Sequence, residues 1–503
     1  MSRTIRLVKR LLVIAALCLI VLGGAAARFV DLGTNPGGLY PDEAAEGITA
    51  RQILADPGYR PVFVPEDGGR EALYAYSLAV GFGVAGESVD VIRGVAAVWG
   101  VLGILGIWLL VRRFGTGAGL AAAAWVAGSL WLIAISRDGM RNTMTPVLEA
   151  FSFLCLIAWV NRPSRSMALI AGASLAIASL YTYNPLKLLI VLVAVWLLWL
   201  RASDRPAYDR AVVHAPAFVI AFAIVAAPMV AAAISDPQAY LGRAIGVTVF
   251  NSALVPQEDL IGHVVRTLGQ FGFVGDPNAR HDVDALPLLG IPLTFVALVG
   301  VAVLWRGRRG PENSLVLLAF PVFLLPQLIA TEGGSPHFLR GLGLVVPLAI
   351  AIGLGAQALG ERMAAVLSSG RWSAVTGRAV STTIVAALFL AVGVMSVSVY
   401  LHRPVAERYA AFSYDLVSMS DMAIRGADAV VVDEVSAYTV SFLAPQVTIL
   451  RPGEALTNPA IERVLARSID ELKAAVGDAA AANAVAVAFG PAGQPTVWAA
   501  PAR

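Results

Sequence analysis

Long apolar runs are the feature of this sequence that most limits how it can fold. Runs of about 20 apolar residues recur along most of the chain, and each is long enough to cross roughly 30 Å of hydrocarbon as an α-helix. Of the 503 residues, 58% are hydrophobic and only 14% are charged, whereas about a quarter of a soluble domain is usually charged. The sequence therefore predicts a polytopic α-helical membrane protein.

The apolar runs predict about eleven membrane crossings. They lie near residues 11–28, 91–111, 118–135, 144–160, 167–184, 188–200, 214–233, 285–305, 314–330, 341–359 and 379–400. The segment 72–86 is too short to span, so we expect it to be re-entrant or to lie at the outer interface.

Basic residues in the short connections predict the orientation, because Lys and Arg are enriched on the cytoplasmic side. The start of the chain reads "MSRTIRLVKRLL" and is expected in the cytoplasm. Further basic connections are "RRFG", "NRPSRS", "RASDRPAYDR", "RGRRG" and residues 361–378. In a plasma membrane, this orientation leaves a loop at 31–90, a loop at 234–284 and a tail at 401–503 outside. The net charge of +3 gives no sign of a nucleic-acid partner.

The first apolar segment also resembles a signal peptide, since it has a basic start and a small-residue stretch, "GGAAAR". We expect an uncleaved anchor because many further spans follow it. Cleavage would still leave residues 31–90 outside.

The tail differs in character from the rest of the chain. The stretches "ADAVVVDE", "QVTIL" and "NAVAVAF" are typical of short strands, and "SIDELKAAVGDAAAANA" of a helix between two of them. We therefore expect residues 1–400 to form the membrane domain and residues 401–503 a small extracytoplasmic α/β domain. The tail contains no glycine-rich nucleotide signature.

Two adjacent carboxylates, Asp42 and Glu43, follow the first span by about a dozen residues. Pro41 suits the first position of a helix running to about Leu54, and acidic residues in a first turn offset the helix dipole. A helix placed here is expected to rest at the membrane surface. Its carboxylates could then meet a substrate that is anchored in the bilayer and has a polar head in water.

Basic residues also stand at predicted outer turns, where they are normally depleted. They are Arg70, Arg137, Arg141, Lys187, His337 and Arg340. An anionic headgroup at the outer leaflet would explain them, because guanidinium groups suit phosphate. The alternatives are arginines that hold ordinary lipid, or ion pairs with Asp138, Glu71 or Glu332.

Aromatic and metal-ligating residues at the outer side carry weaker signals. Four tyrosines lie near the predicted outer interface: Tyr40, Tyr74, Tyr181 and Tyr183. They could contact a sugar or lipid, or they could belong to the aromatic belt that is expected at a membrane interface. His281 with Asp276, Asp282 and Asp284 could hold a divalent cation, but a solvated loop before a helix is the favoured interpretation. We assign no metal ligand and leave a divalent cation open.

Five outer segments together resemble polytopic glycosyltransferases of the GT-C fold, specifically the family-39 group of protein O-mannosyltransferase-like and aminoarabinose-transferase-like enzymes. The segments read "GLYPDEAAEGITARQIL", "GREALYAY", "SRDGMRNTMTP", "YTYNPLK" and "SPHFLRGLGLVVP". The likeness covers roughly residues 10–360.

The resemblance implies a sugar donor linked to polyprenyl phosphate, a hexosyl or pentosyl transfer, and a catalytic acid in the first outer loop. Asp42 matches that acid, with Glu43 beside it. Arg70 aligns with a basic residue that contacts the lipid phosphate and precedes a Pro-Pro-Leu stretch, although this chain reads "REALY" there. The roles of the other outer cations rest on charge and position alone.

The predicted reaction uses Asp42 as a general base and proceeds with inversion, while arginines stabilise the leaving phosphate. The acceptor would be a protein, a lipid or a polysaccharide. The alternative is a transporter or flippase for lipid-linked saccharide. A transporter is expected to show intramembrane ionisable residues and an internal repeat of its spans.

Overall fold

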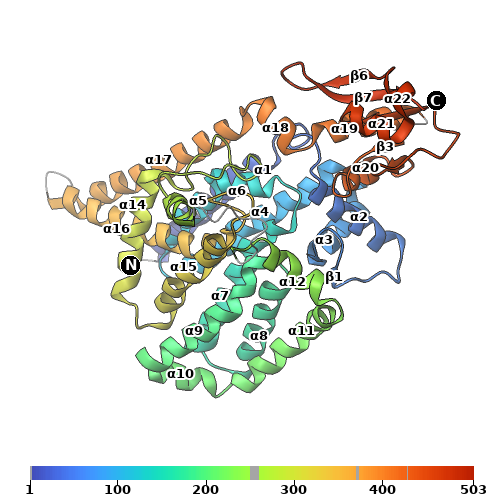
Figure 1. The fold of residues 1–503 in the computed structure, drawn as a ribbon. Helices are drawn as coiled ribbons and strands as arrows, with labels where there is room; N and C mark the ends of the chain where they lie inside the picture. The colour runs from blue at the N-terminus through green and yellow to red at the C-terminus, as the bar shows by residue number, and fades with distance from the viewer. Residues whose placement is uncertain (1–2, 250–259, 370–372, 427–428, 503) are drawn as a thin grey trace.

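The computed structural model is a helical bundle with a small β-sheet at one end (Figure 1). It describes residues 3–249, 260–369, 373–426 and 429–502. The predicted loop 234–284, the connection 361–378 and the tail therefore each include residues that lie outside this description. The fold class predicted from the sequence, a polytopic helical membrane protein with a C-terminal sheet domain, is confirmed.

The long helices follow the predicted apolar segments. They are α1 (Arg3–Phe29), α4 (Val89–Val111), α5 (Thr116–Gly128), α6 (Leu130–Ser136), α7 (Thr145–Asn161), α8 (Arg165–Leu180), α9 (Leu188–Ser203), α11 (Ala215–Ser235), α14 (Gly290–Arg306), α15 (Pro311–Ile329), α16 (Val345–Ser369) and α17 (Ala374–Leu401).

Within the described residues, 8 helical segments are long and apolar enough to cross a membrane, or up to 9 if α5 and α6 form one span. These two helices meet at an angle of 59°. Two further predicted crossings correspond to shorter apolar helices, α8 with 16 residues and α14 with 17. All eleven predicted segments are thus helical, although two are near the lower length limit for a span.

Short elements lie between the long helices. They are α2 (Pro41–Ala55), β1 (Phe63–Val64), β2 (Arg70–Glu71), α3 (Leu73–Ala85), η1 (Arg141–Met144), η2 (Asn184–Lys187), α10 (Arg205–Val212), α12 (Pro237–Gly246), α13 (Leu260–Gly269) and η4 (Leu342–Leu344). Helix α3 has only 13 residues, which agrees with the prediction that segment 72–86 does not span.

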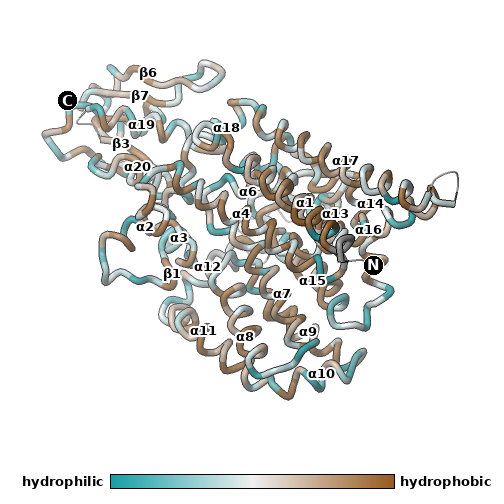
Figure 2. The backbone as a smooth tube through the Cα atoms, turned by 180° about the vertical axis from the view of Figure 1, so that it is seen from behind, coloured by the Kyte–Doolittle hydropathy of each residue, from teal (hydrophilic) through white to brown (hydrophobic). Residues whose placement is uncertain are grey.

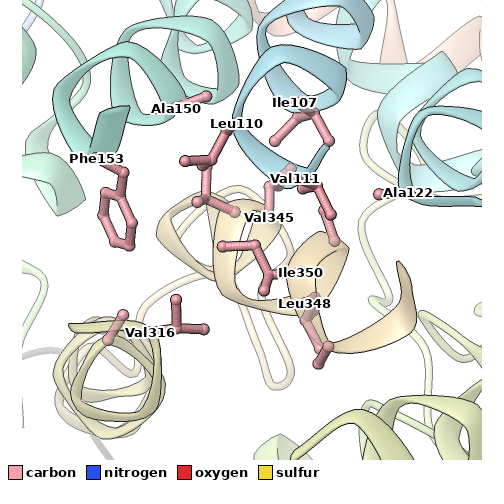
Figure 3. Packing of buried hydrophobic residues seen from close by; sticks show 14 of the residues in the cluster. Ile107, Leu110, Val111, Ala122, Ala150, Phe153, Val316, Val345, Leu348 and Ile350 are labelled. Carbon is pink, nitrogen blue, oxygen red and sulfur yellow. The ribbon is translucent and has the colours of Figure 1, made fainter. Parts of the chain in front are cut away.

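The main core surrounds the N-terminal half of α16 (Figure 3). Val345 and Ile350 lie among apolar residues of four other helices, which are Ile107, Leu110 and Val111 of α4, Ala122 of α5, Ala150 and Phe153 of α7, and Val316 of α15. By contrast, hydrophobic residues along α1, α11 and α17 are largely exposed, and these helices are brown in Figure 2. Exposed apolar helix faces of this kind are expected to contact lipid.

The C-terminal part contains α18 (Val405–Ala411), α19 (Tyr414–Arg425), α20 (Ser436–Leu443), α21 (Ile469–Val476) and α22 (Asp478–Ala481). Its strands are β3 (Ala429–Val431), β4 (Thr448–Leu450), β5 (Arg463–Ala466), β6 (Val485–Phe489) and β7 (Pro495–Pro501). They form one sheet in the order β4-β3-β5-β7-β6. Strand β3 is parallel to β4 and β5, and β7 is antiparallel to β5 and β6.

The three predicted strands correspond to β3, β4 and β6, and the sequence analysis missed β5 and β7. The predicted helix is present as α21 and α22. It is interrupted at Gly477, whose φ of +83° is a conformation that other residues rarely adopt.

Side-chain contacts between the segments that connect the helices agree with the predicted division into cytoplasmic and outer connections. On the side predicted to be cytoplasmic, Glu312 accepts a hydrogen bond from Asn161 at 2.8 Å and lies 3.7 Å from Arg113. On the other side, Glu43 accepts from the backbone N–H of Gly139 at 2.9 Å, and Lys187 lies 3.3 Å from Glu71. The grouping agrees with the predicted alternation, while the orientation in the membrane remains a prediction.

A reporter enzyme that is active only outside the cytoplasm would test this orientation. Fused after Gly47 it is expected to be active, and fused after Gly307 it is expected to be inactive, because basic connections remain inside. Enzyme activity in intact cells is the measurement, with fusion abundance as the control. The reverse pattern would contradict the placement of α2 on the outer side.

Candidate active site

Helix α2 presents the carboxylate pair. Tyr40 is extended, with φ −74° and ψ 143°, and Pro41 occupies the first helical position, as the sequence predicts. The Glu43 carboxylate folds back and accepts a hydrogen bond from the Tyr40 N–H at 3.0 Å. This contact closes the first turn, so Asp42 and Glu43 have fixed and different environments.

Glu43 is fully buried and forms an ion pair with Arg93 of α4. Arg93 donates from Nε to Oε1 at 2.9 Å and from Nη2 to Oε2 at 3.1 Å. Oε1 also accepts from the backbone of Gly139, which follows α6. Three separate segments therefore meet at one carboxylate. Because both charges are buried, removing either partner is expected to cost about 3–5 kcal/mol.

Three of the predicted outer cations converge on a second group of carboxylates. Arg70 lies 3.4 Å from Glu46, and Arg141 lies 3.1 Å from Glu46 and 3.2 Å from Glu71. Lys187 lies 3.3 Å from the other oxygen of Glu71. We call this the carboxylate–cation chain; its members, in spatial order, are Asp67, Arg70, Glu46, Arg141, Glu71 and Lys187.

The carboxylate–cation chain alternates in charge, and only its Lys187 end is substantially exposed. The Lys187 side chain is 23% exposed, whereas the other members are at most 7% exposed. The Lys187 ammonium also donates to Asn184 at 2.6 Å and lies 4.1 Å from the centre of the Tyr240 ring. Of the ion-pair partners named from the sequence, Glu71 is paired with both Arg141 and Lys187. Arg70 instead pairs with Glu46 and Asp67, which the sequence analysis did not name. Lys187 keeps partial exposure.

Asp42 is half-buried and neighbours a second acid, Asp138, which lies between α6 and η1. Burial raises the pKa of Asp138 well above its ordinary value; the charge of Glu43 adds to the rise, Arg280 and Arg93 oppose it, and Asp42 adds further. Two carboxylates in one electrostatic environment favour a protonated form of one of them. The sequence analysis considered Asp138 only as an ion-pair partner.

Arg280 covers the same region from the loop between α13 and α14. Its guanidinium lies 3.7 Å from the centre of the Tyr40 ring, directly before α2. Arg280 was not among the outer cations selected from the sequence, because it lies in a long outer loop, where basic residues are common. Arg93 was missed as well, although a charged residue within an apolar span was a usable signal.

The remaining predicted cations lie apart from the carboxylate–cation chain. Arg137 is fully buried and donates to the carbonyls of Ala27, Val30 and Asn35, which fixes the end of α1. Arg340 donates to the Ala330 carbonyl at 2.9 Å, and its guanidinium lies 3.9 Å from Glu332. His337 lies beside His281, with ring centroids 4.9 Å apart.

The four predicted tyrosines also separate into two pairs. Tyr40 lies under Arg280, and the Tyr183 ring lies 6.0 Å from Arg141, so both border the candidate site. Tyr74 is fully buried and its hydroxyl donates to the Ile92 carbonyl at 3.3 Å. The Tyr181 hydroxyl donates to the Val225 carbonyl at 2.7 Å. These last two rings are occupied in packing between helices.

The C-terminal part packs against α2, as both ribbon views show (Figures 1 and 2). Thr439 of α20 donates to the Leu39 carbonyl at 3.2 Å, and Arg51 donates to the Phe442 carbonyl at 2.8 Å. The Leu39 N–H donates to the Phe412 carbonyl at 2.8 Å. Phe442 joins the apolar cluster around α2 and α3. The tail therefore supports the helix that carries Asp42.

A separate groove of about 1410 Å³ runs along α1, α5, α16 and α17. Its lining is mostly apolar and extends from Arg378 to His402. None of its lining residues belongs to the carboxylate–cation chain or to the Asp42 and Asp138 pair. The groove is therefore separate from the candidate site.

Comparisons with known proteins agree with this fold. The family model described as "Dolichyl-phosphate-mannose-protein mannosyltransferase" matches residues 72–231. No curated protein matches the sequence. ArnT from Cupriavidus metallidurans bound to undecaprenyl phosphate is 14% identical, with a TM-score of 0.60, and the match covers 97% of this chain and 98% of ArnT.

A second similar structure is the archaeal oligosaccharyltransferase AglB from Archaeoglobus fulgidus in complex with an inhibitory peptide and a dolichol-phosphate. It is 13% identical, with a TM-score of 0.57, over 93% of this chain and 72% of AglB. The chain has the GT-C fold. The resemblance predicted from the five outer segments is thereby confirmed.

The two kinds of match cover different parts of this GT-C chain. The family model spans α3 to α11, under half of the chain, and begins after α2. The structural matches extend over nearly the whole chain. The structural similarity therefore includes the segment with Asp42 and Glu43, whereas the family model does not.

Proposed function

We propose that the protein is a membrane glycosyltransferase that moves a sugar from a polyprenyl-phosphate donor to an acceptor at the outer face of the membrane. The observation that carries the proposal is Asp42, a half-buried carboxylate held at the start of α2 beside Asp138 and the carboxylate–cation chain. It is supported by the GT-C fold and by the lipid phosphates bound to ArnT and AglB.

Asp42 acts as the general base in this proposal. It takes the proton from an acceptor hydroxyl or amine while the acceptor atom attacks the anomeric carbon. The bond between that carbon and the phosphate oxygen breaks, and its electron pair stays on the departing polyprenyl phosphate. A single displacement of this kind inverts the configuration of the sugar.

The other acids have supporting roles in the proposed mechanism. Glu43 is paired on both oxygens, so it positions the first turn of α2 and does not meet a substrate. Asp138 is buried, and the rise in its pKa favours its neutral form, which can donate a hydrogen bond beside Asp42.

Lys187 is the residue that we assign to the donor phosphate. It stands at the exposed end of the carboxylate–cation chain and directly before α9, a candidate membrane span. Arg70 and Arg141 are each held between two carboxylates and would fix Glu71 and Lys187 in place. A lysine ammonium binds phosphate as a point charge and tolerates a mobile lipid headgroup.

Asp42→Asn tests the general base. Turnover is expected to fall roughly 10²–10⁴-fold, because the amide cannot accept the proton. The measurement is sugar release from polyprenyl-phosphate sugars of several kinds in liposomes with a mixed acceptor extract, alongside thermal melting. Asp56→Asn, an exposed change at the end of the same helix, is the matched control. Equal turnover in folded Asp42→Asn and wild type would refute the assignment.

Lys187→Gln tests the donor phosphate. The kcat/KM for the donor is expected to fall roughly 10–100-fold, because one hydrogen bond to a charged group is lost. Lys473→Gln is the control, since this exposed lysine in α21 forms only a surface pair with Asp470. An unchanged kcat/KM in Lys187→Gln would place the phosphate elsewhere.

A further inference from the structure

Three potential metal ligands meet beside the candidate active site. Asp276 and His281 lie in the loop between α13 and α14, and His337 lies in the loop between α15 and η4. One ligand atom from each residue lies within 4.8 Å of the others. The favoured interpretation of the first loop as solvated is wrong, because Asp276, His281 and Asp282 are only 1%, 1% and 2% exposed.

The Asp276 carboxylate organises the group. Its Oδ2 accepts from His281 Nδ1 at 3.0 Å and from the Phe338 backbone N–H at 2.6 Å. Its Oδ1 accepts from the Asn278 N–H at 2.8 Å. One carboxylate therefore orients the His281 ring and ties its loop to the residue that follows His337.

The separations of the polar atoms fit a shared cation. His281 Nδ1 and Asp276 Oδ2 lie 3.0 Å apart, which is close to the separation of two neighbouring ligands on one ion of the Zn²⁺ class. His337 Nδ1 is buried and has no hydrogen-bond partner among the described residues. Leaving such an atom unpaired costs about 1–3 kcal/mol, and a bound cation would accept its lone pair.

We propose that Asp276, His281 and His337 bind one transition-metal ion of the Zn²⁺ class. Two imidazole nitrogens with one carboxylate are typical of zinc, whereas Mg²⁺ and Ca²⁺ require mostly oxygen ligands. Arg280 and Arg340 oppose any cation electrostatically, so nitrogen coordination must supply the affinity. Three protein ligands also leave a fourth position for water, as in catalytic zinc sites.

The ion would fix one outer loop against another. Its ligands join the loop that carries Arg280 to the loop that carries Arg340, and Arg280 in turn covers Tyr40 at the start of α2. Binding would therefore hold Arg280 over Tyr40. This inference rests on the geometry of the two loops and does not depend on the proposed transferase activity.

Metal content tests the site directly. The full-length protein, purified with a tag that contains no histidine and stripped with a chelator, is titrated with Zn²⁺ and with Co²⁺. We expect one ion per chain by elemental mass spectrometry, a visible absorption band for Co²⁺ bound to nitrogen, and a higher melting temperature that excess Mg²⁺ does not reproduce. If the stripped wild type takes up less than half an ion per chain, the proposal is refuted without any variant.

Histidine variants locate the ion. His281→Ala and His337→Ala are expected to lose the bound ion and the melting shift, while His402→Ala, an exposed histidine at the end of α17, keeps both. Asp42→Asn should also bind one ion, which separates this site from the proposed general base. Full stoichiometry in either His281→Ala or His337→Ala would overturn the ligand assignment.

Discussion

The buried ion pair between Glu43 and Arg93 is the interaction on which the candidate site depends. Arg93 belongs to a membrane-spanning helix, where an unpaired charge is costly, and Glu43 is its direct partner at 2.9 Å. Arg93 also donates to the carbonyls of Gly37 and Gly38, directly before α2. Because α2 is held at its first turn, the neighbouring residue Asp42 has a defined position relative to the helical bundle.

The charges of the carboxylate–cation chain are also paired in a buried environment. Each inner member of the carboxylate–cation chain lies between two opposite charges, which offsets the cost of burial. Of the members of this carboxylate–cation chain, only Lys187 is substantially exposed. A site of this kind is preorganised, since its charges do not have to reorient when a lipid phosphate arrives.

Local sequence patterns were sufficient for much of the fold. Apolar length predicted the helices, Pro41 predicted the start of α2, and alternating apolar residues predicted β3, β4 and β6. The break between α5 and α6 was missed, although a Gly-Ser pair at positions 128 and 129 is a known cause of helix bending. Strand β7 was missed because it begins and ends with proline. Strand β5 was missed as well, although its 4 residues make it no shorter than β3 and β4.

The partners of the charged residues could not be predicted, because they are distant in the sequence. Glu46 and Arg141 are 95 positions apart, and His281 comes close to His337 only when two loops fold together. Charge and position alone therefore selected the outer cations without identifying their partners. They did not distinguish Lys187, which is accessible, from Arg137, which is enclosed by backbone carbonyls.

A double-mutant cycle on Glu43 and Arg93 tests the central claim most directly. Glu43→Gln, Arg93→Met and the double variant are compared with wild type by melting temperature and by sugar release from the lipid donor. We expect each single variant to melt well below wild type and to lose turnover, because one buried charge is left unpaired. The double variant should lose clearly less stability than the sum of the two single losses. Strictly additive losses in stability, or single variants with wild-type turnover, would contradict the claim that this ion pair positions Asp42.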